Sequence, residues 1–193
     1  MIRRLIAMTV GASLLAVGAP AHAGSQLVVD YTETFNDVKL LSDDGGLTLA
    51  QRQSIDLRRV KIIEFAESTR FKIGMKQVLP TGNFDQMVFV TLKSKGVTPV
   101  QRTDIGLTAQ NSSKGLSYAY LTPDTTGDDL VVCDPLDAKV RKKQNVVFID
   151  VPHSCLPDAP VKIRFTSATG AFRSEGTGFS RDIAVIDGLF EVK

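Results

Sequence analysis

The chain is poor in the side chains that build most binding and catalytic centres. Its 193 residues include no tryptophan, three tyrosines, two cysteines and two histidines. Sugar recognition relies on aromatic faces, so this composition leaves few surfaces for stacking. Two cysteines and His153, the single histidine after the first 23 residues, are too few for a four-ligand zinc site.

Nucleophilic catalysis has no recognisable motif. His153 is followed by Ser154, but neighbouring residues of an extended segment point to opposite faces, so the pair is not expected to act together. The sequence contains no G-x-S-x-G, and the spacing of its acids selects no carboxylate pair for glycosidase chemistry. We therefore expect His153 to be a turn residue and the protein to have no catalytic residues.

The first 23 residues have the pattern of a secretory signal peptide. A basic start at Arg3 and Arg4 precedes an apolar run, Leu5–Val17, and an Ala-x-Ala site that ends at Ala23. The apolar run is shorter than the roughly 20 residues of a membrane span. Cleavage near Ala23 predicts a secreted protein, extracellular or associated with the cell envelope. Residues 24–193 are then expected to form one domain without a membrane span.

Loss of the leader removes the excess of positive charge. The chain has 23 basic and 21 acidic residues, and without Arg3 and Arg4 the basic residues also number 21. A chain without net charge generates no overall field that favours nucleic acid or an anionic membrane. We therefore expect no nucleic-acid partner.

Apolar and polar residues alternate in many short segments. Arg70–Lys76 and Val161–Thr166 place apolar side chains on one face and polar ones, mostly cations, on the other. Within Ile55–Phe65 the alternation shifts near Arg58-Arg59 and again at Ile62-Ile63, which predicts a bulge or burial on both faces. Roughly ten such strands predict an all-β fold, an antiparallel β-sandwich or jelly-roll. Leu47–Ser54 is expected to form one helical turn, capped by Thr48 with Gln51 three residues on.

Both cysteines lie in the segment Leu130–Leu156. Cys133 and Cys155 are equally distant from position 144, inside the polar turn Arg141–Asn145. A simple hairpin register places them opposite each other and predicts a disulfide, which contributes roughly 3 kcal/mol by loop closure. Two free thiols are the alternative. Because Pro152 lacks a ladder donor, a further alternative is that the second strand ends at Val151 and the disulfide ties a loop to the sheet.

Two segments resemble secreted bacterial all-β proteins of unassigned function. Those proteins have a leader, a D-L-R-x-V strand and a late P-x-x-C-L turn. The matching residues here are Ile55–Ile62 and Val151–Leu156, followed by Val161–Phe165. The resemblance implies a secreted β-sandwich and brings no catalytic residues with it.

Acidic residues offer a candidate calcium site. Asp124, Asp128 and Asp129 lie in one turn, and extracellular β-domains bind Ca²⁺ with such oxygens. A second acidic group lies in the N-terminal segment, where only Lys39 offsets Asp30, Glu33, Asp37, Asp43 and Asp44. Neither group has EF-hand spacing, and solvated turn acids are the alternative for both.

Two other groups are candidates for ligand binding. Tyr118 and Tyr120 are two positions apart on an expected strand, so they share a face and form a small stacking platform, or else cover a half-buried sheet. The expected hairpin tip carries cations suited to an anionic envelope polymer, or simply solvated: Lys139, Arg141, Lys142 and Lys143.

The sequence favours a secreted, non-catalytic binding module. Its partner is expected to be an envelope glycan, an extracellular protein or a small ligand. The first alternative is a secreted hydrolase that uses two carboxylates, or calcium and a carboxylate, and it requires a cleft with two acids. The second is a secreted protease inhibitor, which requires a protruding loop such as the cysteine-flanked hairpin.

Overall fold

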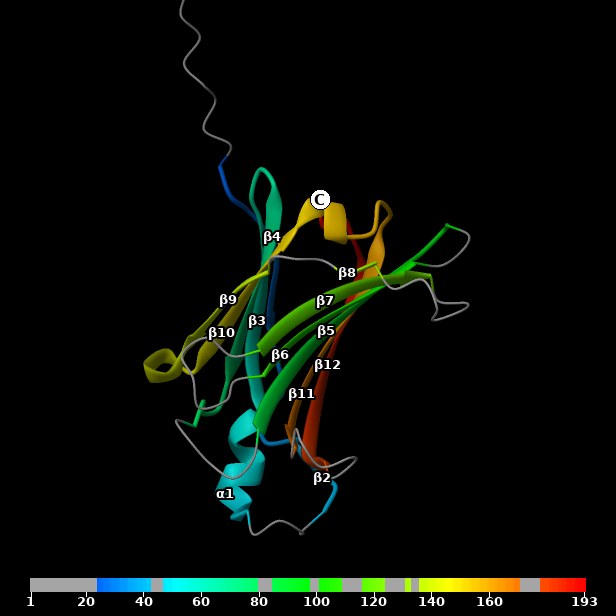
Figure 1. Ribbon diagram of the computed structural model, residues 1–193. Helices are drawn as coiled ribbons and strands as arrows, with labels where there is room; N and C mark the ends of the chain where they lie inside the picture. The colour runs from blue at the N-terminus through cyan, green and yellow to red at the C-terminus, as the bar shows by residue number, and fades with distance from the viewer. Residues whose placement is uncertain are drawn as a thin grey trace, which may run out of the picture.

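The chain folds into two antiparallel β-sheets that pack face to face, with one short α-helix (Figure 1). The computed structural model describes residues 24–42, 47–79, 85–97, 101–108, 116–123, 131–132, 136–170 and 178–193. Within these ranges, ten strands have five residues or more, and two further strands have only two residues. The predicted all-β sandwich is therefore confirmed.

The first sheet has five strands in the order β1-β3-β4-β10-β9. β3 pairs with β4 as a hairpin, β9 pairs with β10 as another, and β4 pairs with β10 to join them. The bounds are Gln26–Thr32 (β1), Leu57–Glu64 (β3), Ser68–Met75 (β4), Asp137–Arg141 (β9) and Val146–Pro152 (β10).

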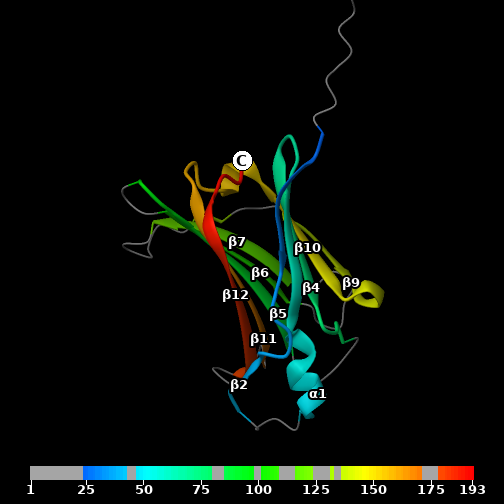
Figure 2. The ribbon, with the colours of Figure 1, turned by 180° about the vertical axis from the view of Figure 1, so that it is seen from behind.

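The second sheet has seven strands in the order β2-β12-β11-β5-β6-β7-β8. The bounds are Lys39–Leu40 (β2), Asp85–Ser94 (β5), Gln101–Thr108 (β6), Leu116–Pro123 (β7), Val131–Val132 (β8), Val161–Gly170 (β11) and Gly178–Phe190 (β12). The N-terminal segment contributes to both sheets, since β1 belongs to the first and β2 to the second. Figure 2 shows this segment in blue, with β12 beside it on the neighbouring sheet.

The two sheets share one apolar core. Phe71 of β4 and Phe165 of β11 are both fully buried, and their ring centroids lie 6.5 Å apart at 57°. Burying a side chain of this size stabilises the fold by about 1.5–3 kcal/mol relative to leaving it exposed. Their sheets therefore form one unit, and further core residues include Ile62, Ile73, Val90, Leu92, Ile149 and Ile163.

The alternation read from the sequence matches the burial. Along β4 every second residue is buried, and the cationic positions Arg70 and Lys72 lie on the outer face. The predicted irregularity near Arg58-Arg59 is confirmed by a register shift between Leu57 and Arg59. A second shift lies on β1, opposite Ile62 and Ile63.

The predicted helical turn closes one end of the sandwich. Thr48 caps helix α1 (Leu49–Arg52) through a capping box with Gln51, as expected. A 3-10 turn, η1 (Gln53–Ile55), follows and leads into β3. Figure 1 shows α1 at the opposite end of the molecule from the C-terminus. Within the described ranges, no helix has the length and apolar character needed to cross a membrane.

The hairpin predicted to contain both cysteines is shorter than expected. Its strands pair from Arg141–Val146 to Asp137–Asp150 around a 3-10 turn, η2 (Lys142–Gln144). Val131 and Val132, expected in the first strand, form β8 and pair with β7 in the other sheet. The expected cross-strand register of the cysteines is therefore wrong, because the segment that leads to Cys133 belongs to a different sheet from β10.

Cys155 lies beyond the end of β10. Pro152 is the last residue of this strand, and a 3-10 turn, η3 (His153–Cys155), follows it. Pro152 supplies no N–H to continue the ladder, which agrees with the expectation that this proline ends the strand, although the last residue is Pro152 and not Val151. Cys155 is buried and lies in a turn. Its pairing with Cys133 stays a prediction, because Cys133 lies outside the described residues.

Candidate functional site

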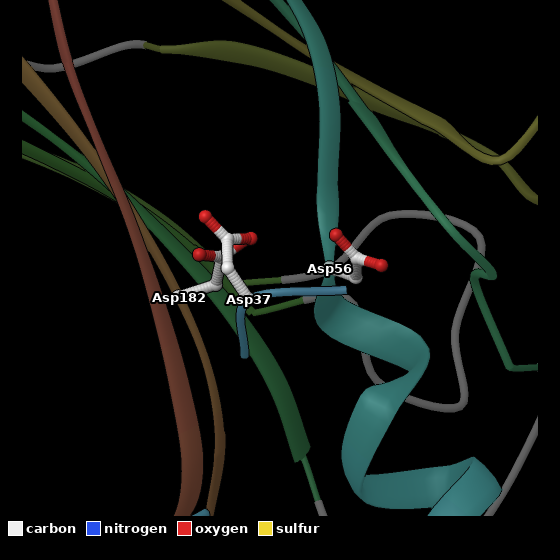
Figure 3. A group of neighbouring side chains, drawn as sticks. All are labelled: Asp37, Asp56 and Asp182. Carbon is white, nitrogen blue, oxygen red and sulfur yellow. The ribbon is translucent and has the colours of Figure 1, made fainter. Parts of the chain in front are cut away.

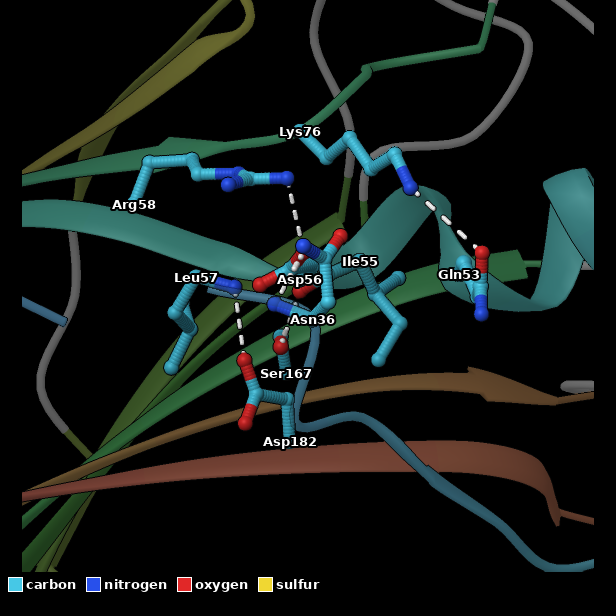
Figure 4. A network of polar contacts seen from close by, with 9 residues as sticks. All are labelled: Asn36, Gln53, Ile55, Asp56, Leu57, Arg58, Lys76, Ser167 and Asp182. Atoms are coloured by element: carbon cyan, nitrogen blue, oxygen red, sulfur yellow. Dashed lines mark hydrogen bonds and ion pairs between the residues drawn. The ribbon is translucent and has the colours of Figure 1, made fainter. Parts of the chain in front are cut away.

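The end of the core next to α1 is polar. Inward-facing side chains there are buried and bind the backbone of the α1–η1–β3 connection. Ser167 Oγ donates to the Ile55 carbonyl and the Leu57 N–H donates to Asp182 Oδ2, each at 2.6 Å (Figure 4). Ser180 Oγ donates to the Arg52 carbonyl, also at 2.6 Å. A connection that crosses a core buries backbone polar groups, and these need partners. The polar end is thus first a consequence of the fold.

Three carboxylates meet at this polar end. Asp37 lies in the loop between β1 and β2, Asp56 directly precedes β3, and Asp182 faces inward from β12 (Figure 3). One carboxylate oxygen from each lies within 4.8 Å of the other two. Asp56 and Asp182 are buried, whereas Asp37 is exposed. We refer to these residues as the three-aspartate cluster.

Asp56 is held from one side only. Its Oδ2 accepts from Arg58 Nη2 at 2.7 Å and from the backbone N–H of Asn36 at 3.1 Å (Figure 4). Its Oδ1 is buried and has no hydrogen-bond partner among the described residues. A buried polar atom left unpaired costs about 1–3 kcal/mol, and more when it is charged. This oxygen is therefore the least satisfied atom of the cluster.

The turn before Asp37 fixes that residue near the other two. Asn36 has a φ of 65°, a left-handed conformation that asparagine tolerates better than most residues. The guanidinium of Arg58 lies 4.2 Å from the ring centroid of Phe35, so Arg58 is held between Phe35 and Asp56. These contacts attach the β1–β2 loop to the start of β3.

Burial and neighbouring negative charges both raise the pKa of Asp182. Burial raises the pKa of Asp182 to about 6, and the charges of Asp37 and Asp56 act in the same direction. Hydrogen bonds from the N–H groups of Leu57 and Ile183 oppose the increase. The cluster therefore favours a proton or another positive charge among its oxygens.

The sequence indicated only one member of this cluster. Asp37 belongs to the N-terminal acidic group described above, whereas Asp56 and Asp182 are not among the candidate residues. The sequence does contain a pattern that indicates burial of Asp182. Its position alternates with those of Ala184 and Ile186, which lie on the buried face of β12. A carboxylate in a row of inward positions needs partners, and their identity depends on residues more than a hundred positions away.

A second candidate site lies on the outer face of the seven-stranded sheet. A groove of about 400 Å³ is lined by Thr91, Lys93, Arg102, Lys162, Ile163, Arg164 and Val185. Lys93 pairs in register with Lys162 of β11 on one side and Arg102 of β6 on the other. Three cationic positions thus follow one another across three strands. We call this site the basic groove.

The other N-terminal acids lie outside the three-aspartate cluster. Asp30 pairs with Arg59 at 2.6 Å and Lys61 at 2.8 Å, both from β3, so Lys39 is not the only cation that offsets this segment. Hydrogen bonds from Arg59 and Lys61 hold the pKa of Asp30 well below its usual range. Asp43 and Asp44 lie outside the described residues, as do the calcium candidates Asp124, Asp128 and Asp129.

The remaining ligand-binding candidates are placed only in part. Tyr118 and Tyr120 occupy alternate positions of β7, but their side chains are outside the described part of the structure. At the hairpin tip, Lys139 binds Asp137 at 2.8 Å and the guanidinium of Arg141 lies 5.0 Å from the centroid of Phe148. Lys142 and Lys143 lie in η2.

His153 opens the 3-10 turn η3. Its backbone N–H donates to the Glu67 carbonyl at 3.1 Å, and its Nε2 is buried without a hydrogen-bond partner among the described residues. Ser154 is exposed, and its Oγ lies 3.9 Å from Cys155 Sγ. The expected turn position of His153 is confirmed.

Comparisons with known proteins identify no relative of this chain. No protein-family model matches the chain, and no curated protein or solved structure is significantly similar to it. The resemblance to secreted bacterial β-proteins therefore stays a prediction, and the arguments for function rest on the geometry of the two sites.

Proposed function

We propose that this protein is a secreted, non-catalytic binding module that holds an anionic ligand in the basic groove. The row of cations Arg102, Lys93 and Lys162 on adjacent strands carries the proposal. Like charges directly opposite each other destabilise a sheet, and a bound anion offsets that cost. Lys93 and Arg102 also interact with other groups of the protein. Lys162 and the neighbouring Arg164, both exposed, are therefore the first cations we assign to the ligand.

An acidic polysaccharide of the cell envelope fits this groove best. The groove is open along a sheet face, which suits a linear polymer, and its cations suit carboxylate or phosphate groups. Val185 lines the groove with 56% of its surface exposed, and Ile183 is exposed two positions away on the same face of β12. These side chains provide apolar contact for sugar rings. The signal-peptide pattern supports a ligand outside the cell.

Burial of the acids favours binding over hydrolysis. A carboxylate-based glycosidase needs two acids that flank the scissile bond of a bound substrate. Asp56 and Asp182 lie inside the sandwich, and neither lines the basic groove. The hairpin tip proposed for a protease inhibitor is a 3-10 turn, which offers no extended segment to a protease.

Calorimetric titration of the purified protein with polygalacturonate at low salt tests the proposal. We expect binding that weakens with added NaCl, because salt screens exposed charges, and no binding of neutral dextran. The double variant Lys162→Glu/Arg164→Glu is expected to bind at least about tenfold more weakly. The matched control, Lys139→Glu/Lys143→Glu at the hairpin tip, should bind like the wild type. Equal binding of dextran, or loss of binding only in the tip variant, contradicts the proposal.

A further inference from the structure

We propose that the three-aspartate cluster binds one Ca²⁺ ion, with one oxygen supplied by each of Asp37, Asp56 and Asp182. This site is separate from the basic groove, and the inference does not depend on the ligand proposed there. An ion at this position joins the β1–β2 loop, the start of β3 and the middle of β12. It therefore links both sheets at the polar end of the core.

The spacing of the oxygens fits a shared cation. Calcium binds carboxylate oxygens at about 2.4 Å, so two ligands on opposite sides of the ion are at most about 4.8 Å apart. The three oxygens of the cluster lie within 4.8 Å of one another. They come from three segments that are far apart in the sequence, and Ca²⁺ accepts the irregular geometry that such a set produces.

Asp56 provides a second and independent reason. Its side chain is fully buried, yet Oδ1 has no hydrogen-bond partner within the part of the chain that the structure describes, while Oδ2 accepts from Arg58 and Asn36. Figure 3 shows the carboxyl groups of Asp37 and Asp182 close together, with that of Asp56 to their right at the start of β3. A buried carboxylate oxygen without a donor is costly, and coordination to a metal ion is one of the ways in which proteins satisfy it.

The charges also balance. The cluster contains three carboxylates, and the guanidinium of Arg58 contacts one of them at 2.7 Å. Two negative charges are left, which equals the charge of one Ca²⁺ ion. Asp37 is exposed, so the ion can enter from this side and water can complete its coordination shell, which takes six to eight oxygens.

Removal and return of the ion provide the test. The purified protein is treated with EDTA, dialysed, and titrated with CaCl₂ or MgCl₂ by calorimetry, and its thermal melt is recorded at each step. We expect one Ca²⁺ per chain, with weaker binding of Mg²⁺. At a free Ca²⁺ concentration of about ten times the dissociation constant, we expect the melting midpoint to rise by roughly 3–6 °C.

Single substitutions assign the ion to its ligands. Asp37→Asn alters an exposed loop carboxylate and is expected to lower Ca²⁺ affinity at least about tenfold without changing the circular dichroism spectrum. Asp182→Asn removes a negative charge from the buried side of the cluster and should also abolish the calcium-dependent rise of the melting midpoint. The matched control is Asp187→Asn, an exposed acid on the same strand, which should bind Ca²⁺ like the wild type.

Three results overturn the inference. The first is the absence of any heat or melting response at 10 mM CaCl₂. The second is wild-type Ca²⁺ affinity in a folded Asp37→Asn variant. The third is loss of calcium binding in the triple variant of Asp124, Asp128 and Asp129 to Asn while Asp37→Asn still binds, which assigns the ion to the other acidic turn.

Discussion

The outer faces of the two sheets carry the same kinds of residue in different arrangements. On the five-stranded sheet, Arg70 forms a bidentate pair with Asp150 at 2.6 and 2.7 Å and lies 5.0 Å from the Phe65 ring centroid. On the seven-stranded sheet, Lys162 and Arg164 line an open groove. The first arrangement uses its cations to stabilise the sheet, and the second leaves them exposed along the groove in which we propose that a ligand binds.

Cross-strand register explains the contrast. The segments Arg70–Lys76 and Val161–Thr166 have the same alternation of cationic and apolar residues. In the structure, however, Arg70 is directly opposite Asp150, whereas Arg164 is opposite Thr91 and Val185. The role of a surface cation is thus set by the residue that the neighbouring strand places beside it.

The largest effect is expected from breaking the pair on the five-stranded sheet. Asp150→Ala leaves a partly buried guanidinium without its carboxylate, so we expect the free energy of unfolding to fall by about 1–3 kcal/mol. Arg164→Ala on the other sheet is expected to change it by less than about 0.5 kcal/mol. Urea denaturation of both variants measures the difference, and equal losses contradict the contrast between the faces.

A smaller effect is expected from giving Arg164 a partner. Val185→Glu places a carboxylate directly opposite Arg164, and such a pair contributes about 0.2–1 kcal/mol to stability. The same change should weaken binding of polygalacturonate several-fold, because it neutralises one cation of the groove. Val185→Gln is the uncharged control. Unaltered polyanion binding in the Glu variant contradicts the role given to Arg164.

The smallest effect on stability is expected from protonation of Asp30 at low pH. Arg59 and Lys61 hold the pKa of Asp30 below its value in the unfolded chain, about 3.9. Its contribution to stability is therefore complete above that value and is lost as the pH falls below it. The stability difference between wild type and Asp30→Asn should shrink when urea denaturation is repeated at pH 7, 4 and 3. A difference that is constant over this range contradicts the assignment.

Much of the fold could be predicted because it depends on local patterns. Alternation in β4 and β11, the capping box at Thr48 and the bulge before Arg59 are all properties of short segments. The hairpin predicted over Leu130–Leu156 is too long, because Val131–Val132 are as suitable for one sheet as for the other. Which sheet they join depends on pairing with β7, and no local pattern specifies that.

The sites were harder to predict for the same reason. The three-aspartate cluster joins residues at positions 37, 56 and 182, and the basic groove joins four strands. Neither has a sequence spacing that could be recognised. Acids and cations that are neighbours in the sequence, such as the cations of the hairpin tip, can be recognised as groups, whereas these two sites cannot.

The pairing of β2 with β12, together with other contacts between the two ends of the chain, affects how the protein folds. Leu40 pairs with Ser180, Leu57 donates to Asp182 and Thr69 donates to the carbonyl of Val192 at 2.6 Å. Contacts over such separations require a costly closure of the intervening chain, and folds rich in them form slowly. A chain delivered N-terminus first therefore leaves its early strands without these partners until the last residues have emerged. For the secreted protein that we propose, such a delay would keep the polypeptide extended during passage through an export channel.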